Sequence, residues 1–79
     1  MTDALVFVTG RGCHLCEHGR EVLARLDVRA REVDVDGEES KALAARGVPL
    51  SFLPVLTDGR RAIAYGRFSE RRLRKELGL

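Results

Sequence analysis

The two cysteines of this chain, Cys13 and Cys16, are separated only by His14 and Leu15. This C-x-x-C spacing lets the two sulfur atoms approach each other across the first turn of a helix. The unpaired N–H groups and the positive dipole end of that helix stabilise a thiolate there. We therefore expect a depressed pKa for Cys13, with Arg11 as an additional cause. A C-x-x-C beside a βα unit is typical of a thiol–disulfide redox site.

Other roles for the same cysteines stay open. With His14 and His18 they are candidate zinc ligands, although on a helix Cys16 projects away from His18 and the chain has no second C-x-x-C. We expect no resident metal, and keep a metal or iron–sulfur carrier as the alternative function. A third role is a purely structural pair of buried thiols. His14 either tunes the thiolate or is a surface residue, and His18 is expected on the helix surface.

The sequence around the cysteines predicts the elements that position them. Residues 4–9 are continuously apolar, which favours a strand covered on both faces. After Gly10-Arg11-Gly12, apolar residues recur at helical spacing and predict a helix from about Cys13 to Leu26. The strand expected over 28–35 alternates valine with acidic residues, so that one face is exposed to water. The helical positions are Leu15, Gly19, Val22, Leu23 and Leu26.

The second half predicts a helix, a hairpin and a final helix. A short helix over 38–46 is followed by Gly47 as its C-terminal cap. Asp58-Gly59 indicates a turn between strands 55–57 and 62–65, and Ser69 is a candidate N-cap for a helix with Leu73 and Leu77 on its inner face. The order β-α-β-α-β-β-α predicts an α/β fold with a four-stranded mixed sheet and a right-handed first crossover. The cysteines then lie at the carboxyl end of the first strand, where open sheets place their sites.

Length and composition restrict the class of protein. The 79 residues are expected to form one domain, 1–79, with a net charge of +2. The apolar run near the N-terminus is too short for a signal peptide and no segment is long enough to span a bilayer, so we expect a cytoplasmic protein without a membrane partner. The last third is basic, which suits a solvated helix face, an acidic partner or nucleic acid. We favour the solvated face and expect no nucleic-acid binding.

Two segments carry a resemblance to a known family. The Gly10–Cys16 stretch and Leu53-Pro54-Val55-Leu56-Thr57-Asp58-Gly59, with the acidic second strand between them, resemble the glutaredoxin-like proteins of the thioredoxin-fold superfamily. The segment Ala64-Tyr65-Gly66-Arg67-Phe68 is similar to redoxins that donate electrons to ribonucleotide reductase. The resemblance covers essentially the whole chain. It implies a thioredoxin-like three-layer α/β/α fold and a thiol–disulfide oxidoreductase.

The resemblance also implies residue roles. Cys13 is the exposed nucleophile and Cys16 the shielded resolving thiol. Pro54 is the cis proline beside the disulfide, while the backbone of Leu53 pairs with an extended substrate. Pro49 is the alternative cis proline, and Pro54 is favoured by its spacing from the Asp58-Gly59 turn. Gly66, Arg11 and His14 are further candidate substrate-binding residues.

The family's partners follow as expectations. Substrates are disulfides in proteins or small molecules, and the reductant is either glutathione or a thioredoxin-reductase-type enzyme. The chain lacks the paired aspartates with which glutaredoxins grip glutathione, although Gly66 and the helix start at Ser69 still suit a carboxylate. We expect a monomer with no bound cofactor. Tyr65 and Phe68 either line a substrate groove or belong to the core, and Arg67 is a candidate contact for an acidic substrate.

Overall fold

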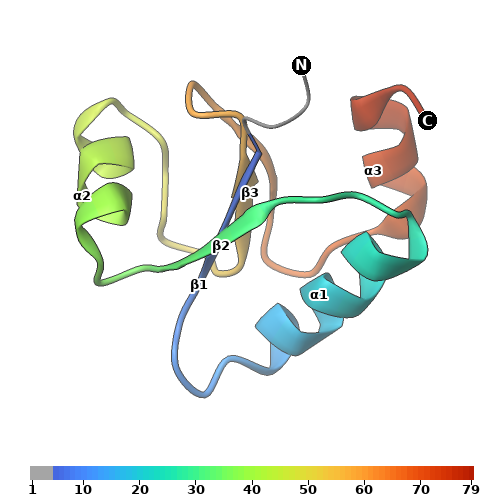
Figure 1. Cartoon of the computed structure of the whole chain (residues 1–79), viewed down its shortest axis with the longest axis horizontal. Helices are drawn as coiled ribbons and strands as arrows, with labels where there is room; N and C mark the ends of the chain where they lie inside the picture. Colours follow the sequence, from blue (N-terminus) through green and yellow to red (C-terminus); the bar gives the residue numbers. More distant parts are fainter. Residues whose placement is uncertain (1–4) are drawn as a thin grey trace.

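A computed structural model describes residues 5–79, and in this part of the chain three helices accompany a four-stranded mixed sheet (Figure 1). The predicted order of elements is confirmed. The strand expected from residue 4 begins at Val6, and Ala4 itself lies outside the described residues. The elements are β1 (Val6–Thr9), α1 (His14–Arg25), β2 (Arg31–Asp34), α2 (Glu38–Ala45), β3 (Val55–Thr57), β4 (Ala62–Tyr65) and α3 (Glu70–Leu77).

The strands lie in the order β2-β1-β3-β4. β1 runs parallel to β2 and antiparallel to β3, and β4 is antiparallel to β3. The two central strands are buried along their whole length, whereas β2 at one edge is mostly exposed. This explains why β1 is continuously apolar while acidic residues are tolerated in β2. The parallel strands β1 and β2 are joined through α1, which is the crossover that the sequence predicts.

The helices cover both faces of the sheet, with α1 and α3 on one side and α2 on the other (Figure 1). Successive residues of β1 point to opposite faces, so Phe7 packs towards α1 and α3 whereas Val6 and Val8 pack towards α2. Two small apolar clusters therefore form the core. The first contains Phe7, Val22, Leu23, Leu26, Leu56, Phe68 and Leu73, and the second contains Val6, Val8, Leu43, Val48 and Val55.

Local signals mark several element boundaries close to their predicted places, whereas the strand expected over 28–35 covers only Arg31–Asp34. The Ser69 hydroxyl accepts a hydrogen bond from the Arg72 N–H at 3.2 Å and caps α3. Gly47 follows α2 with φ of 97°, a left-handed conformation that favours glycine. In the hairpin the Asp58 carboxylate accepts bonds from the N–H groups of Arg60 and Arg61. None of the helices in the described chain is long and apolar enough to cross a bilayer.

Candidate active site

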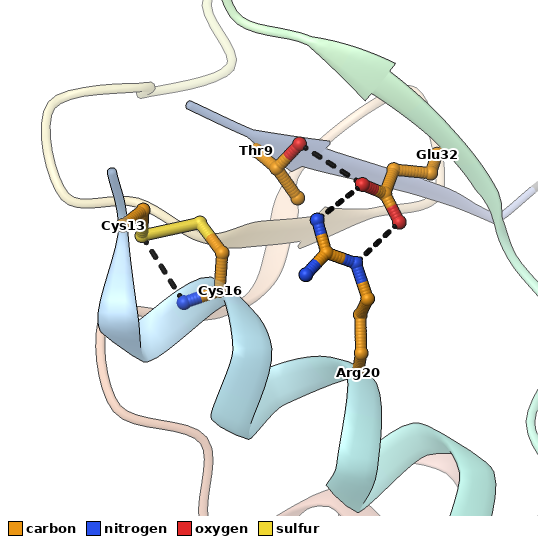
Figure 2. A network of polar contacts seen from close by, with 5 residues as sticks. All are labelled: Thr9, Cys13, Cys16, Arg20 and Glu32. Atoms are coloured by element: carbon orange, nitrogen blue, oxygen red, sulfur yellow. Dashed lines mark hydrogen bonds and ion pairs between the residues drawn. A yellow bond between two sulfur atoms is a disulfide. The ribbon is translucent and has the colours of Figure 1, made fainter. Parts of the chain in front are cut away.

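Cys13 and Cys16 are joined by a disulfide at the start of α1, with their Cα atoms 5.2 Å apart (Figure 2). The position follows from the chain path. β1 ends at Thr9, a short loop crosses the end of the sheet, and Cys13 is the residue that caps the helix. The two cysteines differ in accessibility, because Cys16 is 1% exposed whereas Cys13 is only half-buried. An external reagent therefore reaches Cys13 more easily than Cys16.

The Cys13 sulfur occupies the place that a serine or aspartate oxygen usually takes at a helix N-terminus. Its backbone is extended, with φ of −94° and ψ of 103°. The Cys16 N–H donates to Cys13 Sγ at 3.1 Å (Figure 2). A backbone donor and the positive end of the α1 dipole thus both point at this sulfur. Negative charge on Cys13 Sγ after reduction would be stabilised by both.

The loop before β3 packs on both sides of the cysteine motif. The Leu53–Pro54 peptide bond is cis, and no other cis bond occurs in the described chain, so Pro54 and not Pro49 is the cis proline. A Cβ atom on Gly10 would lie 2.8 Å from Leu53 Cδ1, and one on Gly19 would lie 3.2 Å from Pro54 Cγ. These two glycines leave room for the loop immediately before Cys13 and one turn after Cys16. The loop is therefore a direct neighbour of the disulfide-bearing turn.

Three further contacts hold this end of the molecule together. The Gly66 N–H donates to the carbonyl oxygens of Phe52 at 3.1 Å and Pro54 at 3.0 Å. His18 Nε2 lies 3.2 Å from the carbonyl oxygen of Phe68 and connects α1 with the segment after β4. The Gly66 N–H is thus used within the protein, and a role for Gly66 in binding substrate stays a prediction.

The remaining predicted binding residues, Arg11 and His14, are exposed at the same end of the fold. Arg11 lines an open hollow of about 380 Å³ together with Asp34, Asp36 and Gly37. His14 is the first residue of α1 and has no hydrogen bond from its side chain to another described residue. A role for either residue in binding substrate stays a prediction.

An ion pair near the disulfide was missed by the sequence analysis. Arg20 Nε and Nη2 donate to the two carboxylate oxygens of Glu32 at 2.9 and 2.6 Å, and Thr9 Oγ1 donates to the same carboxylate at 3.3 Å (Figure 2). The hydrogen bonds from Arg20 lower the pKa of Glu32 against the opposing effect of burial, and those same bonds raise the pKa of Arg20. The group ties α1, one turn beyond Cys16, to β2 and to the end of β1. Thr9 and Arg20 are twelve or more residues from Glu32 in the sequence, so no local sequence pattern predicts these contacts.

The aromatic residues near the site have separate roles. Phe68 is 3% exposed and packs edge-to-face on Phe7 with ring centroids 5.7 Å apart, so it belongs to the core. Tyr65 is 61% exposed and lies against Phe52, which is 68% exposed, at a centroid distance of 6.3 Å. Phe52 was not among the candidate residues, because a single aromatic in a loop has no periodic signal.

In the described part of the chain, no three His, Cys, Asp or Glu side chains gather as a metal-ligand set. Comparisons of the chain with protein-family models, curated proteins and solved structures give no match. The chemistry of the site follows from its own geometry. That geometry is a disulfide with one accessible and one buried sulfur, capped by a helix and bordered by a cis-prolyl loop.

Proposed function

We propose that the protein is a thiol–disulfide oxidoreductase that reduces disulfides of proteins or small molecules by exchange through Cys13 and Cys16. The observation that carries this proposal is the unequal exposure of two bonded cysteines at the start of a helix. A disulfide with a purely structural role gains most when it closes a long loop, whereas this one closes only a single helical turn. The disulfide is therefore suited to repeated reduction and reoxidation.

We also propose a glutaredoxin-like protein with a thioredoxin-like fold as the family and architecture. Support comes from the mixed sheet with helices on both faces, the disulfide at the end of β1, and the cis Pro54 packed against α1. The last feature is independent of the cysteines. It brings together two segments that are far apart in the sequence.

The reaction starts from the reduced form. The Cys13 thiolate attacks one sulfur of a substrate disulfide, forms a mixed disulfide with it, and releases the other substrate sulfur as a thiolate. Cys16 then loses its proton and attacks the Cys13 sulfur. This step forms the Cys13–Cys16 disulfide and releases the second substrate thiolate, so that two electrons pass from the protein to the substrate. The described state, with both sulfurs bonded, is the product of this cycle.

The accessibility of each cysteine fits its step. The first attack requires contact with an external disulfide, and Cys13 is the cysteine that solvent reaches. The second attack is intramolecular and needs no access from solvent, and burial of Cys16 keeps external disulfides from reacting with this thiol first. An external thiol, either glutathione or a dithiol reductase, returns the protein to its reduced form. We propose that this takes place in the cytoplasm, with the protein as a monomer.

The test uses two single substitutions and the double variant as a baseline. Cys13→Ser is expected to abolish reduction of 2-hydroxyethyl disulfide in the presence of a thiol reductant. Cys16→Ser is expected to form a stable mixed disulfide with the substrate, seen as a mass increase that dithiothreitol reverses. Equal residual activity in the two single variants would refute the assigned roles. A visible chromophore or stoichiometric metal in protein purified without oxygen would instead favour the metal or iron–sulfur carrier.

A further inference from the structure

Two exposed aromatic side chains lie together at the end of the sheet that leads to the cysteines. Among the described residues, the large hydrophobic side chains that are mostly exposed are Phe52, Tyr65 and Leu79. Phe52 and Tyr65 contact each other. Tyr65 is level with Val55 and Val8 in the sheet, so the pair lies at the end of β1 that leads to Cys13. Single exposed hydrophobic residues are ordinary, but a contiguous patch at the same end of the fold as a reactive group indicates an interaction surface.

This aromatic pair is held in place by the backbone. Gly66, directly after Tyr65, donates its N–H to the carbonyl oxygen of Phe52 and to that of Pro54. Leu53, which follows Phe52 in the chain, packs against Gly10. The rings therefore project from a fixed support. Aromatic side chains on a rigid support lose little conformational entropy when a partner covers them.

The surface beyond Tyr65 is basic. Tyr65, Arg67, Ser69 and Arg72 line a hollow of about 150 Å³ between the end of β4 and the start of α3. Arg67 and Arg72 are exposed and form no ion pair with any described residue. Two unpaired guanidinium groups at one hollow favour a carboxylate-bearing partner. A second copy of the chain is disfavoured, because a symmetric contact through this face would bring like charges together.

We propose that this surface receives an extended segment of a protein disulfide, with a bulky apolar side chain next to the reactive cysteine and carboxylates beyond it. The apolar side chain lies on Phe52 and Tyr65, and a carboxylate reaches Arg67 and Arg72. The inference rests on the proposed function and narrows its substrates from disulfides in general to acidic polypeptides with an apolar residue beside the cysteine.

The experiment uses synthetic peptides with one cysteine bonded to thionitrobenzoate. The peptides carry Leu or Ser beside the cysteine, and Glu or Lys three residues further on. Reduction of one such disulfide by the Cys13/Cys16 dithiol gives the free peptide thiol, a coloured thionitrobenzoate and the oxidised protein. The mixed disulfides of thionitrobenzoate with 2-mercaptoethanol and with glutathione serve as small substrates. Stopped-flow absorbance gives second-order rate constants.

The wild type is expected to reduce the Leu peptides about tenfold faster than the Ser peptides, the discrimination that a modest apolar contact supplies. Phe52→Ser combined with Tyr65→Ser should bring this ratio close to one, and should lower the rate with the Leu peptides far more than the rate with the mercaptoethanol substrate. Leu79→Ser removes an equally exposed apolar side chain elsewhere and should leave the ratio unchanged. A preserved ratio in the double variant, or no preference in the wild type, would overturn the inference.

The charge component has its own matched pair of variants. Glu peptides should react several-fold faster than Lys peptides at low salt, and this preference should fade as salt screens the charges. Arg67→Glu with Arg72→Glu should reverse the preference, whereas Lys75→Glu on the same helix should not. A glutathione substrate that outpaces every peptide, with the same sensitivity to these variants, would contradict a polypeptide occupant. Failure to reduce any substrate, the mercaptoethanol one included, would overturn the proposed function itself.

Discussion

Gly19 provides the sharpest test of how the cis-prolyl loop is seated on the helix of the cysteines. It is buried in α1, and a Cβ atom there would lie 3.1 Å from Phe7 Cζ and 3.2 Å from Pro54 Cγ. Such distances are shorter than ordinary van der Waals contact, so Phe7 or Pro54 has to move by a few tenths of an ångström. Gly19→Ala therefore sets helix propensity against packing.

The two effects have opposite signs. Ala is favoured over Gly in a helix interior by about 1 kcal/mol. Overpacking of a core costs about 1–3 kcal/mol. Phe7 is 2% exposed on the central strand β1, and Pro54 is fully buried between the loop and α1, so neither side chain has free space to move into. We expect packing to dominate and Gly19→Ala to lower the free energy of unfolding by about 1 kcal/mol.

The assay is urea unfolding of the oxidised protein, followed by far-UV circular dichroism. For a domain of this size the slope is about 1 kcal/mol per molar urea, so the midpoint should fall by about 1 M. Ala24→Gly, at an exposed position of the same helix, measures the propensity difference without the packing contact. A Gly19→Ala protein that gains the stability that Ala24→Gly loses would refute the argument, since the loop would then not press on α1.

Substitutions at three other positions test further contacts in the fold. Glu32 has a pKa held below its ordinary value of 4.5, mainly by Arg20 hydrogen bonds, so its stabilisation is present above that pH and is lost as pH falls through the lower folded value. Because both side chains are partly exposed, Glu32→Gln should lower the free energy of unfolding by less than about 1 kcal/mol near neutral pH and should not lower it in strong acid. Urea titrations at neutral and at strongly acid pH measure this difference, and an equal loss at the two pH values would contradict the ion pair. The hydroxyl of the fully buried Thr57 donates to the Arg61 carbonyl oxygen and accepts from the Gly59 N–H. In the same urea assay, Thr57→Val should lower the free energy of unfolding by about 1–3 kcal/mol and Thr57→Ser by less. Equal losses in the two variants would show that the hydroxyl does not contribute. Ser69→Ala should lower stability by about 1 kcal/mol by removing the α3 cap, while Ser69→Asp should keep most of it; identical thermal midpoints for the wild type and the Ala variant would exclude a capping role.

The candidate site is only partly visible in the amino-acid sequence. The C-x-x-C pair at a strand-to-helix junction can be found directly, because a strand of apolar residues and a helical repeat flank it. The spacing of Pro54 from Asp58-Gly59 favoured it over Pro49, and the structure has the cis bond there. Neither Phe52 nor the Arg20–Glu32 pair is predicted from the sequence, since neither belongs to a repeat, a cap or a turn signal.

The sequence by itself determined the order of elements, the boundaries marked by Ser69, Gly47 and Asp58-Gly59, and the position of the cysteines at the end of β1. These features depend on interactions between residues a few positions apart, which composition and periodicity record. Only the tertiary structure decided that Phe68 is buried and Tyr65 exposed, that Pro54 rests on Gly19, and that Arg20 reaches Glu32. Those contacts depend on strand register and on which face each helix presents, and a shift of one residue in a strand would turn every side chain to the opposite face.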